Sequence, residues 1–418
     1  MDLTEWLTWI KSLHSKEIDL SLERTAQVAE KLGLLRPVCP VVTVAGTNGK
    51  GSCVAGIEAI TLTAGYKVGA FTTPFLLRYN EQVRLQGEPV ADPILCEAFE
   101  EIAEACGQVT LTPFEFGTLA ALVIFKKAKL DLWILEVGMG GRWDAVNVIS
   151  ADIALITSIA IDHVDWLGNT RDAIGYQKAG IFRRNKPAIY GDFQPPQSVL
   201  DYADTLETPL FLQGQQFSFV EKETTWNWWS EQTKLDNLPL SSLTLQNMST
   251  VLMAIELLQK KLPVPHSAIE LALTKVMLPG RIQVIPGDIT RILDVSHNPA
   301  AVELLARYLR KNPCTGKTYA VFSMLGDKDI VEAIRSIQDA IDYWYVAPLA
   351  IERAASSAVM AYAFRKLKLK NVAFYQSIVE ASRAAEQQAA LDAGSSSLRI
   401  GNRVIVFGSF HTVSEVIQ

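Results

Sequence analysis

The chain has 418 residues, 49% of them hydrophobic, and a formal net charge of −6 at pH 7. This length predicts two domains or three with sizeable cores, and the acidic balance argues against a general nucleic-acid-binding surface, which would be basic. No apolar run reaches membrane-spanning length, and the five cysteines show no paired metal-ligand spacing, so we expect a cytoplasmic protein with reduced thiols and no membrane anchor.

The first predicted strand runs directly into a glycine-rich turn. Residues 1–35 are expected to be helical, and they lead to the segment 41–52, VVTVAGTNGKGS. Its apolar, β-branched start predicts a buried strand, its glycines predict a turn, and the apolar spacing over 53–62 predicts a helix. A strand, a glycine-rich turn and a helix in this order aim backbone N–H groups at one phosphate.

This turn has the residue types that a triphosphate site needs. Its glycines let the backbone approach phosphates closely, and Lys50 can reach the outer phosphates, while Thr47 or Ser52 could add a hydroxyl near a metal. The spacing departs from the usual G-x-x-x-x-G-K-S/T pattern, because Val44 replaces its first glycine and Gly51 follows the lysine. The alternative is a structural turn that binds no ligand; we favour the triphosphate site.

Strands and helices alternate through the next hundred or so residues. In chain order we expect a strand at 68–73, a charged loop over the nucleotide at 80–84, helices at 93–106 and 112–127, and strands at 132–137 and 153–159. The last two strands are almost continuously apolar, which is typical of parallel strands covered on both faces. The first domain is therefore α/β, and ligands should collect beyond the carboxyl ends of its strands.

A smaller, β-rich part is expected at 187–243, which is rich in Pro, Gln, Trp and Thr. The cluster of Trp226, Trp228 and Trp229 suggests either base stacking or packing in a core or sheet. We favour packing, because the surrounding residues are not basic. Helices at 247–260 and 267–276 then close the domain at Pro279-Gly280-Arg281.

A second α/β pattern occupies the rest of the chain. Pro286, Gly287 and Asp288 signal a turn, so we expect domains at 1–284 and 292–418 joined by a linker at 285–291. Only 394–397 hints at low complexity, and no repeat period is visible. In chain order the expected elements are a strand at 291–295, a helix at 300–309, a strand at 318–323, a helix at 330–341, a strand at 343–346, helices at 357–367 and 378–391, and a strand at 403–407.

Two candidate metal ligands follow the buried strands. Glu136 ends one strand, where a carboxylate is hard to keep charged without a cation, so it is a candidate magnesium ligand; a helix-capping glutamate is the alternative. A lone histidine such as His163 is more often structural, but the phosphate turn and Glu136 favour metal binding here. Its neighbours Asp162 and Asp165 could orient the ring.

Other polar residues have a functional and a structural interpretation. Lys178 precedes Gly180, a usual helix stop, and a surface lysine is the commoner case there. Asp294 and His297 follow the first strand of the second domain, where they could contact ribose or substrate; taken alone, this motif is only a turn signal. At the start of the helix at 112–127, the sequence TPFE offers a cap, a first-turn proline and an acid that favours the positive helix end.

Several motifs resemble one family in order and spacing. GTNGKGS at 46–52, LEVGMGGRWDAVNVI at 135–149, DHVDWLGNT at 162–170, QKAGIFR at 177–183, PGR at 279–281 and DVSHNP at 294–299 resemble the Mur ligase superfamily, and within it folylpolyglutamate synthases. TPFEFGT at 112–118 and VFGSFHTV at 406–413 are similar to the bacterial bifunctional dihydrofolate and folylpolyglutamate synthases.

The resemblance implies an N-terminal P-loop ATPase-like domain, with a mainly parallel sheet flanked by helices, and a C-terminal Rossmann-like domain. It implies the following ATP contacts: Thr47, Asn48, Gly49, Lys50, Gly51, Ser52, Asn247, Arg281 and Asp294. It also implies a magnesium site, with two ions expected, at Thr73, Glu136 and His163. The catalytic residues would then be Lys50, Glu136, His163 and Lys178, the last of them a candidate for carbamylation.

The resemblance also implies the substrates. The pterin would be held by Thr112, Pro113, Phe114, Glu115, Trp143, Asp144 and Ala145. The incoming glutamate would be held by His297 and Ser409. The expected protein is a monomeric ATP- and magnesium-dependent ligase that joins L-glutamate to dihydropteroate, and further glutamates to reduced folates, through an acyl phosphate.

Two other functions stay open on the sequence. A peptidoglycan-precursor ligase of the same superfamily usually has a separate N-terminal domain for the nucleotide-sugar, whereas about forty residues precede the phosphate turn here. A nucleotide-driven switch would hydrolyse ATP without making an amide. We expect small-molecule substrates, and neither nucleic acid nor membrane as partner.

Overall fold

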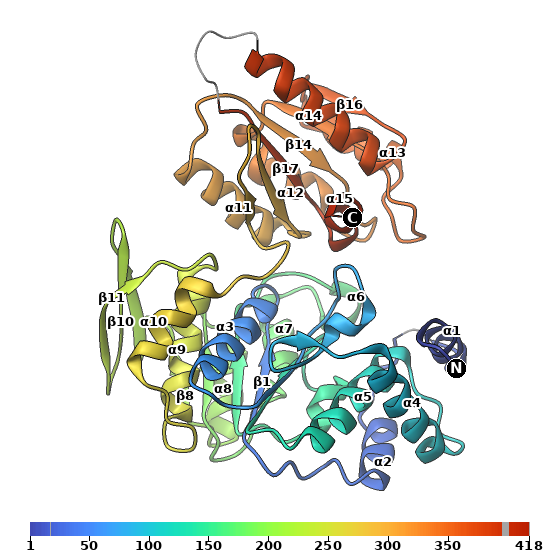
Figure 1. The fold of residues 1–418 in the computed structure, drawn as a ribbon, viewed down its shortest axis with the longest axis vertical. Coiled ribbons are helices and arrows are strands. Elements are labelled where there is room, and N and C mark those ends of the chain that lie inside the picture. Colours follow the sequence, from blue (N-terminus) through green and yellow to red (C-terminus); the bar gives the residue numbers. More distant parts are fainter. Residues whose placement is uncertain (17, 395–400, 418) are drawn as a thin grey trace. The chain divides into compact units, whose positions relative to one another are not determined.

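The computed structural model describes residues 1–16, 18–394 and 401–417 (Figure 1). The expected low-complexity residues 395–397 lie outside them. The chain divides into two compact units, Met1–Met277 and Leu278–Gln418. The division differs from the expected one, because residues 285–291 belong to a hairpin of the second unit in which β12 (Gln283–Ile285) pairs with β13 (Thr290–Asp294). A hairpin turn gives the same Pro-Gly-Asp signal as a linker, so the sequence pattern did not separate the two.

The first unit is built on an eight-stranded sheet in the order β4-β3-β2-β5-β1-β6-β7-β8. Six neighbouring strands, β2, β5, β1, β6, β7 and β8, run parallel, as expected, and β3 and β4 add an antiparallel edge. The strands are β1 (Val41–Ala45), β2 (Val68–Phe71), β3 (Val83–Leu85), β4 (Glu88–Pro89), β5 (Leu132–Glu136), β6 (Ile153–Ile156), β7 (Ala188–Tyr190) and β8 (Leu210–Leu212). Part of the loop expected at 80–84 is therefore strand β3, preceded by the 3-10 helix η1 (Tyr79–Gln82).

The central strand β1 is buried along its whole length because helices cover both faces of the sheet. On one face, Val41 and Ala45 share a core with Phe116 and Leu119 of α5 (Pro113–Ala128). Three other helices lie beside the sheet, and the first of them packs against the other two (Figure 1). They are α3 (Lys50–Thr63), α9 (Leu245–Leu258) and α10 (His266–Lys275).

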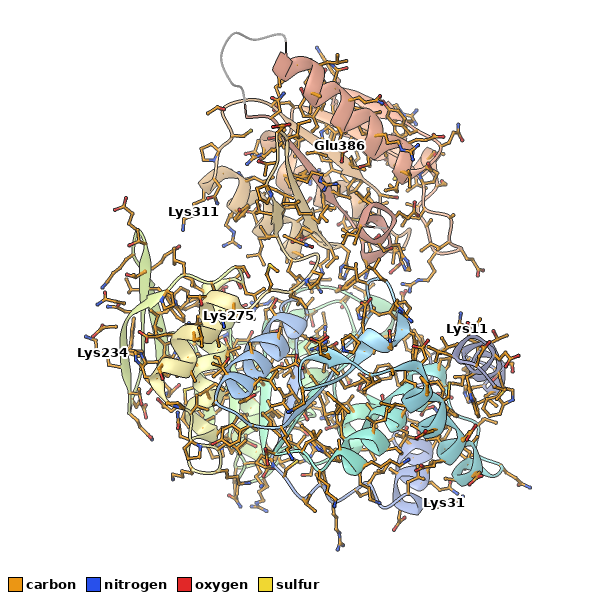
Figure 2. The ribbon with its side chains drawn as sticks, in the orientation of Figure 1. Lys11, Lys31, Lys234, Lys275, Lys311 and Glu386 are labelled. Carbon is orange, nitrogen blue, oxygen red and sulfur yellow. The ribbon has the colours of Figure 1, made fainter. Side chains whose placement is uncertain are left out.

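The N-terminal region is helical, as predicted, but in two pieces. They are α1 (Leu3–Leu13) and α2 (Glu23–Lys31), and both contact α4 (Asp92–Cys106). Several exposed lysines, seen in Figure 2, stand in the last turn of a helix, where a positive charge interacts favourably with the helix dipole. Examples are Lys11 in α1, Lys31 in α2 and Lys275 in α10.

The tryptophan cluster lies in a small sheet of three strands, β9 (Phe217–Glu221), β10 (Thr225–Ser230) and β11 (Lys234–Pro239). Trp226 and Trp228 are buried, and their indole N–H groups donate to the backbone carbonyls of Pro239 and Ser249. The preference for packing over base stacking is therefore confirmed for these two residues.

The second unit is the expected α/β domain. Its sheet has the order β12-β13-β17-β14-β15-β16, with β13, β17, β14, β15 and β16 parallel. Three short elements were missed: β12, β16 (Val372–Phe374) and the C-terminal α15 (Phe410–Ile417). The other elements are α11 (Pro299–Lys311), β14 (Thr318–Phe322), α12 (Ile330–Ile337), β15 (Tyr343–Val346), α13 (Ser357–Lys366), α14 (Ile378–Gly394) and β17 (Arg403–Phe407). Within the part of the chain that the structure covers, every helix is too short or too polar to cross a membrane.

Candidate active site

The site in the first unit forms where four neighbouring parallel strands end. β2, β5, β1 and β6 are adjacent in the sheet and point the same way. The segments that follow them therefore meet at one edge. These segments carry Thr73 after β2, Glu136 at the end of β5, the glycine-rich turn after β1, and His163 after β6.

The glycine-rich turn has a shape that only glycine allows. Gly46 and Gly49 have φ angles of +146° and +90°, and Gly49 is the N-cap of α3. A Cβ atom on Gly49 would lie 2.6 Å from the side-chain oxygen of Asn247, which shows how closely α9 approaches the turn. The helix begins at Lys50, three residues earlier than the sequence predicted, and no side chain caps its first N–H groups. An uncapped N-terminus of this kind suits an anion.

The residues that follow β6 hold the turn in place. Thr47 N–H donates to the Ser158 carbonyl at 2.8 Å, and the Thr157 hydroxyl donates to the Asn48 carbonyl at 2.6 Å. The Thr47 hydroxyl donates to the Ala160 carbonyl at 3.2 Å. We did not single out Thr157 or Ser158 in the sequence, because they lie inside an expected strand.

Two lysines converge on this turn. Lys50 Nζ donates to the Gly46 carbonyl at 3.2 Å, and Lys178 Nζ, from α7 (Arg171–Ala179), donates to the same carbonyl at 2.8 Å. Lys178 is only 4% exposed, so the surface-lysine interpretation is wrong. Burial, and then the charge of Lys50, lower the pKa of Lys178 to about 7, while Asp162 and Asp144 act in the opposite direction. The positive charge of Lys50 beside this carbonyl favours a polyanionic ligand.

Two of the three expected metal ligands lie side by side. Thr73 N–H donates to Glu136 Oε2 at 3.3 Å, and Glu136 is buried at the strand end. His163 lies apart from β6 as the N-cap of α6 (Val164–Leu167), in the left-handed conformation with φ +51°, and its side chain is exposed. A carboxylate and a hydroxyl are hard oxygen donors, which fit magnesium. Among the residues that the structure describes, no group of three or more His, Cys, Asp or Glu side chains could hold a metal.

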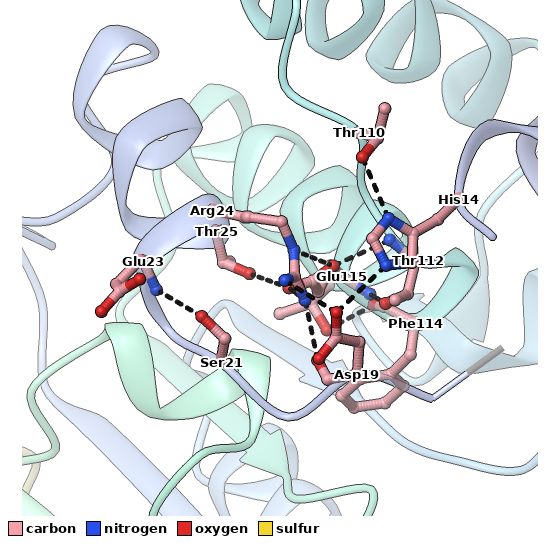
Figure 3. A network of polar contacts seen from close by, with 11 residues as sticks. His14, Asp19, Ser21, Glu23, Arg24, Thr25, Thr110, Thr112, Phe114 and Glu115 are labelled. Atoms are coloured by element: carbon pink, nitrogen blue, oxygen red, sulfur yellow. Dashed lines mark hydrogen bonds and ion pairs between the residues drawn. The ribbon is translucent and has the colours of Figure 1, made fainter. Parts of the chain in front are cut away.

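The start of α5 is the centre of a polar network (Figure 3). Thr112 and Glu115 form a capping box, in which Thr112 N–H donates to Glu115 Oε2 at 2.7 Å. Arg24 pairs with Glu115 at 3.0 Å and with Asp19 at 3.0 Å, and His14 Nε2 lies 3.2 Å from Asp19. The buried Glu115 carboxylate thus binds protein groups and fastens Arg24 and Thr25 to α5. The sequence suggested the cap but not its partner Arg24.

Phe114 and Asp144 come together over Gly138. A Cβ atom on Gly138 would lie 2.7 Å from the Phe114 ring and 3.4 Å from Asp144 Oδ2. Asp144 is buried and accepts from the N–H groups of Met139 and Val146 at 2.9 and 3.0 Å. Burial raises the pKa of Asp144 to about 7, although the N–H donors lower it in part. Next to it, Trp143 is 47% exposed and Ala145 is buried.

In the second unit the expected residues are held by local bonds. Asp294 is buried at the end of β13 and accepts from the N–H groups of Ile282 and Ser296 at 2.8 and 2.9 Å and from the Ser296 hydroxyl. Burial raises the pKa of Asp294. The buried Ser409 hydroxyl accepts from Thr412 N–H at 2.9 Å, at the start of α15.

An aromatic ring connects the other two expected residues of this unit. The Arg281 guanidinium lies 4.7 Å from the Phe410 ring centroid, and the His297 ring lies 6.1 Å from the same ring. Phe410 immediately follows Ser409 and is the first residue of α15. Asp294 and Ser409 therefore lie at an end of β13 and of α15, and Arg281 and His297 lie near the Phe410 ring. Phe410 had no role in the sequence interpretation, because an aromatic residue in a motif of this kind carries no spacing signal.

Comparison with known proteins gives a consistent result over the whole chain. Residues 44–192 match the Mur ligase middle domain, and residues 280–410 match the Mur ligase glutamate ligase domain. The dihydrofolate synthase/folylpolyglutamate synthase of Escherichia coli (strain K12) is 41% identical over 416 residues, which are 100% of this chain and 95% of that protein.

Solved structures agree. Escherichia coli FolC in complex with DHPP and ADP has a TM-score of 0.93 at 40% identity, covering 100% of this chain and 97% of that one. A bifunctional folylpolyglutamate synthase/dihydrofolate synthase with Mn, AMPPNP and L-glutamate bound has a TM-score of 0.91 at 41% identity, with 100% and 97% covered. This chain therefore belongs to the dihydrofolate synthase/folylpolyglutamate synthase family of Mur ligases, which are ATP-dependent ligases.

Proposed function

We propose that this protein joins L-glutamate to dihydropteroate, and further glutamates to reduced folates, at the expense of ATP. The observation that carries the proposal is the turn at 46–52, with its uncapped helix start and two lysines at one carbonyl. The relatives that match the whole chain support the choice of substrates, since one was solved with DHPP and ADP and another with AMPPNP and L-glutamate.

ATP contacts are proposed at the residues of the turn and at Asn247, whose side chain reaches Gly49. Arg281 and Asp294 of the second unit are proposed as further contacts. A divalent cation is proposed at Thr73, Glu136 and His163, and two ions remain our expectation. When bound, the cation neutralises phosphate charge and fixes the phosphate geometry.

Lys178 is proposed to be carbamylated. A lysine reacts with carbon dioxide through its neutral amine, and burial has lowered the Lys178 pKa to about 7, so much of the amine is neutral at physiological pH. The modification would place a carboxylate-like group at the phosphate turn, where Lys178 now contacts Gly46. Incubation with ¹³C-labelled bicarbonate should give a carbamate carbon signal that the Lys178→Met variant lacks; equal signals in both proteins would exclude the modification at this lysine.

The pterin is proposed to lie at Phe114, Trp143 and Asp144, with Ala145 and the start of α5 beside it. The exposed Trp143 ring and the Phe114 ring offer faces for stacking, and Asp144 offers a polar group in an apolar setting. Thr112, Pro113 and Glu115 set the start of α5, and Glu115 would act by holding it in place. His297 and Ser409 remain the proposed contacts of the incoming glutamate.

The chemistry needs activation of an acid. A carboxylate is a poor electrophile for an amine, so the γ-phosphoryl group of ATP is transferred to it, which gives an acyl phosphate and ADP. The amine of L-glutamate then attacks the acyl carbon, and phosphate leaves as the amide forms. The protein contributes positioning and charge: the turn N–H groups and Lys50 hold the phosphates, and exclusion of water protects the acyl phosphate.

Measuring ADP release with dihydropteroate and L-glutamate, singly and together, tests the proposal. We expect release to require both substrates, with mass analysis showing one product per ADP. Release that ignores glutamate would support the nucleotide-driven switch, and a requirement for a peptidoglycan precursor would support the other Mur-type ligase. Whole-chain relatives named for folate substrates favour neither alternative.

Two further assignments complete the proposal. All five cysteines are free thiols in the structure, which fits a reducing compartment, so the cytoplasm is the proposed location. We propose a monomer, in line with the family resemblance, which sedimentation at micromolar concentration would test.

A further inference from the structure

The segment between β2 and β3 is organised around its own carboxylate. Glu81 accepts from the N–H groups of Leu76, Leu77 and Arg78 at 2.8, 2.9 and 2.7 Å. Three backbone donors on one carboxylate hold the outer part of this segment, and Asn80 adds a bond from its side-chain nitrogen to the Val90 carbonyl at 3.0 Å. At the base, next to Thr73, Thr72 N–H donates to the Gln82 carbonyl at 2.9 Å, so the backbone of Thr72 is held by β-type pairing and its side chain is held by another group.

Arg84 ties that base to the helix that follows the phosphate turn. From β3, its Nε and one terminal nitrogen donate to Glu58 Oε2 of α3 at 3.0 and 2.8 Å. Its other terminal nitrogen donates to the Thr72 hydroxyl at 2.9 Å. The Arg84 and Glu58 side chains are 14% and 7% exposed, so the pair is shielded from solvent.

A continuous chain of bonds therefore joins the phosphate helix to the proposed metal site. It runs from Glu58 to Arg84, then to Thr72, whose neighbour Thr73 donates its N–H to Glu136. The planar guanidinium bonds two partners in fixed directions, which a lysine cannot reproduce because its ammonium is a single point charge. This series of hydrogen bonds fixes Thr73 relative to both the phosphate turn and Glu136.

We propose that Arg84 is a positioning residue for the divalent cation: through Thr72 it holds Thr73 beside Glu136 so that the metal–nucleotide complex binds. This inference rests on the proposed function. The competing interpretation is that the Arg84–Glu58 pair only stabilises the fold. The two differ in what they predict for metal affinity when stability is unchanged.

The deciding variant is Thr72→Val. It removes the hydroxyl that Arg84 bonds, keeps the side-chain shape and leaves the Arg84–Glu58 pair intact. Mutation of a group that orients a metal ligand typically lowers metal affinity by ~10–100-fold. We therefore expect the Thr72→Val variant to bind Mn²⁺ about tenfold more weakly than the wild type in the presence of AMPPNP. Free Mn²⁺ is measured by electron paramagnetic resonance, and the melting temperature is measured on the same samples.

Arg84→Lys provides a second, independent variant, and Arg78→Gln is its matched control. Arg78 lies in the same segment and pairs with Asp92 at 3.4 Å, but the two side chains are 69% and 41% exposed. We expect Arg84→Lys to weaken Mn²⁺ binding at least as much as Thr72→Val, and Arg78→Gln to bind like the wild type. In turnover assays the half-saturating Mg²⁺ concentration should follow the same order, since mere loss of folded protein lowers kcat alone.

The outcomes separate this inference from the proposed function. If wild-type protein with AMPPNP fails to bind Mn²⁺, the proposed function is wrong. If the wild type binds and Thr72→Val binds equally tightly, Arg84 is only a structural residue and the inference is overturned, even when Arg84→Lys fails to fold.

Discussion

The turn between β1 and α3 in the first unit and the turn between β13 and α11 in the second both leave a parallel strand and enter a helix. In the first, the N-cap is Gly49, no side chain caps the helix, and Lys50 and Lys178 lie at the turn. In the second, the Asn298 side chain accepts from Ala301 N–H at 3.0 Å and caps the helix. The two turns have the same topology, but the first leaves its helix N-terminus open to an anion and the second covers it with a side chain.

This difference shows what identifies an anion site in such a sheet. Every helix start has unpaired N–H groups, but a side-chain cap uses them, and an acid such as Asp294 adds negative charge. An anion is favoured only where the cap is missing and cations are close. Substitutions in the two turns should therefore have different kinds of effect.

The largest effect is expected from Lys50→Ala. Removing a positive charge that stabilises a transferring phosphoryl group should lower kcat by ~10²–10³-fold. ADP release with both substrates measures it. A loss below tenfold would mean that the cations of the first turn are not what distinguishes it from the second.

The next largest effect is expected from Lys178→Met, in the pH dependence of the unfolding free energy. Because the folded-state pKa of about 7 lies below the ordinary 10.5, the unfolded chain binds the extra proton between these values, so this lysine destabilises the fold least at high pH. From pH 7 to 10 the unfolding free energy of the wild type should rise by ~1 kcal/mol per pH unit relative to the variant. Urea unfolding at several pH values measures this, with carbon dioxide excluded; parallel curves would contradict the burial effect.

Gly49→Ala should weaken AMPPNP binding about tenfold or more, a loss of over ~1.4 kcal/mol. A Cβ atom there would meet Asn247, and the backbone has a φ of +90°. Gly65→Ala is the matched control, since Gly65 has a φ of +92° but nothing within 4 Å of a Cβ atom. It carries the backbone strain alone, so calorimetric titration should find its AMPPNP affinity unchanged.

The smallest effect is expected from Asn298→Ala in the second turn. Loss of a side-chain cap costs ~1 kcal/mol of stability, and AMPPNP should bind as in the wild type. Thermal unfolding and titration together check this. A large loss of AMPPNP affinity in the Asn298→Ala variant would show that the second turn also contributes to nucleotide binding.

The sequence predicted the parts of the site that depend on local pattern. The strand and glycine turn around Lys50, the strand-end Glu136 and the capped start of α5 are each visible within a dozen residues or so. One local boundary was wrong: α3 includes Lys50, because the left-handed Gly49 is already its cap. A glycine turn and a helix start look alike until the backbone angles are known.

The rest depends on contacts between distant segments. Arg24 bonds a carboxylate 91 residues away, and Arg84 bonds one 26 residues away. Nothing in the neighbourhood of either arginine selects its partner, since any acid of suitable geometry would serve. The burial of Lys178 is hidden for the same reason, because it follows from the packing of α7 and not from the lysine's own neighbours.

The place of β1 in its sheet has a consequence for synthesis. Residues 41–45 leave the ribosome early, yet both of their pairing partners, 132–136 and 153–156, emerge about a hundred residues later. Closing loops of that length delays formation of the sheet, so the apolar side chains of β1 stay exposed until its partner strands have been synthesised. We expect the earliest part of this catalytic centre to be translated first and completed last, and a chain stalled before residue 153 to depend on chaperones.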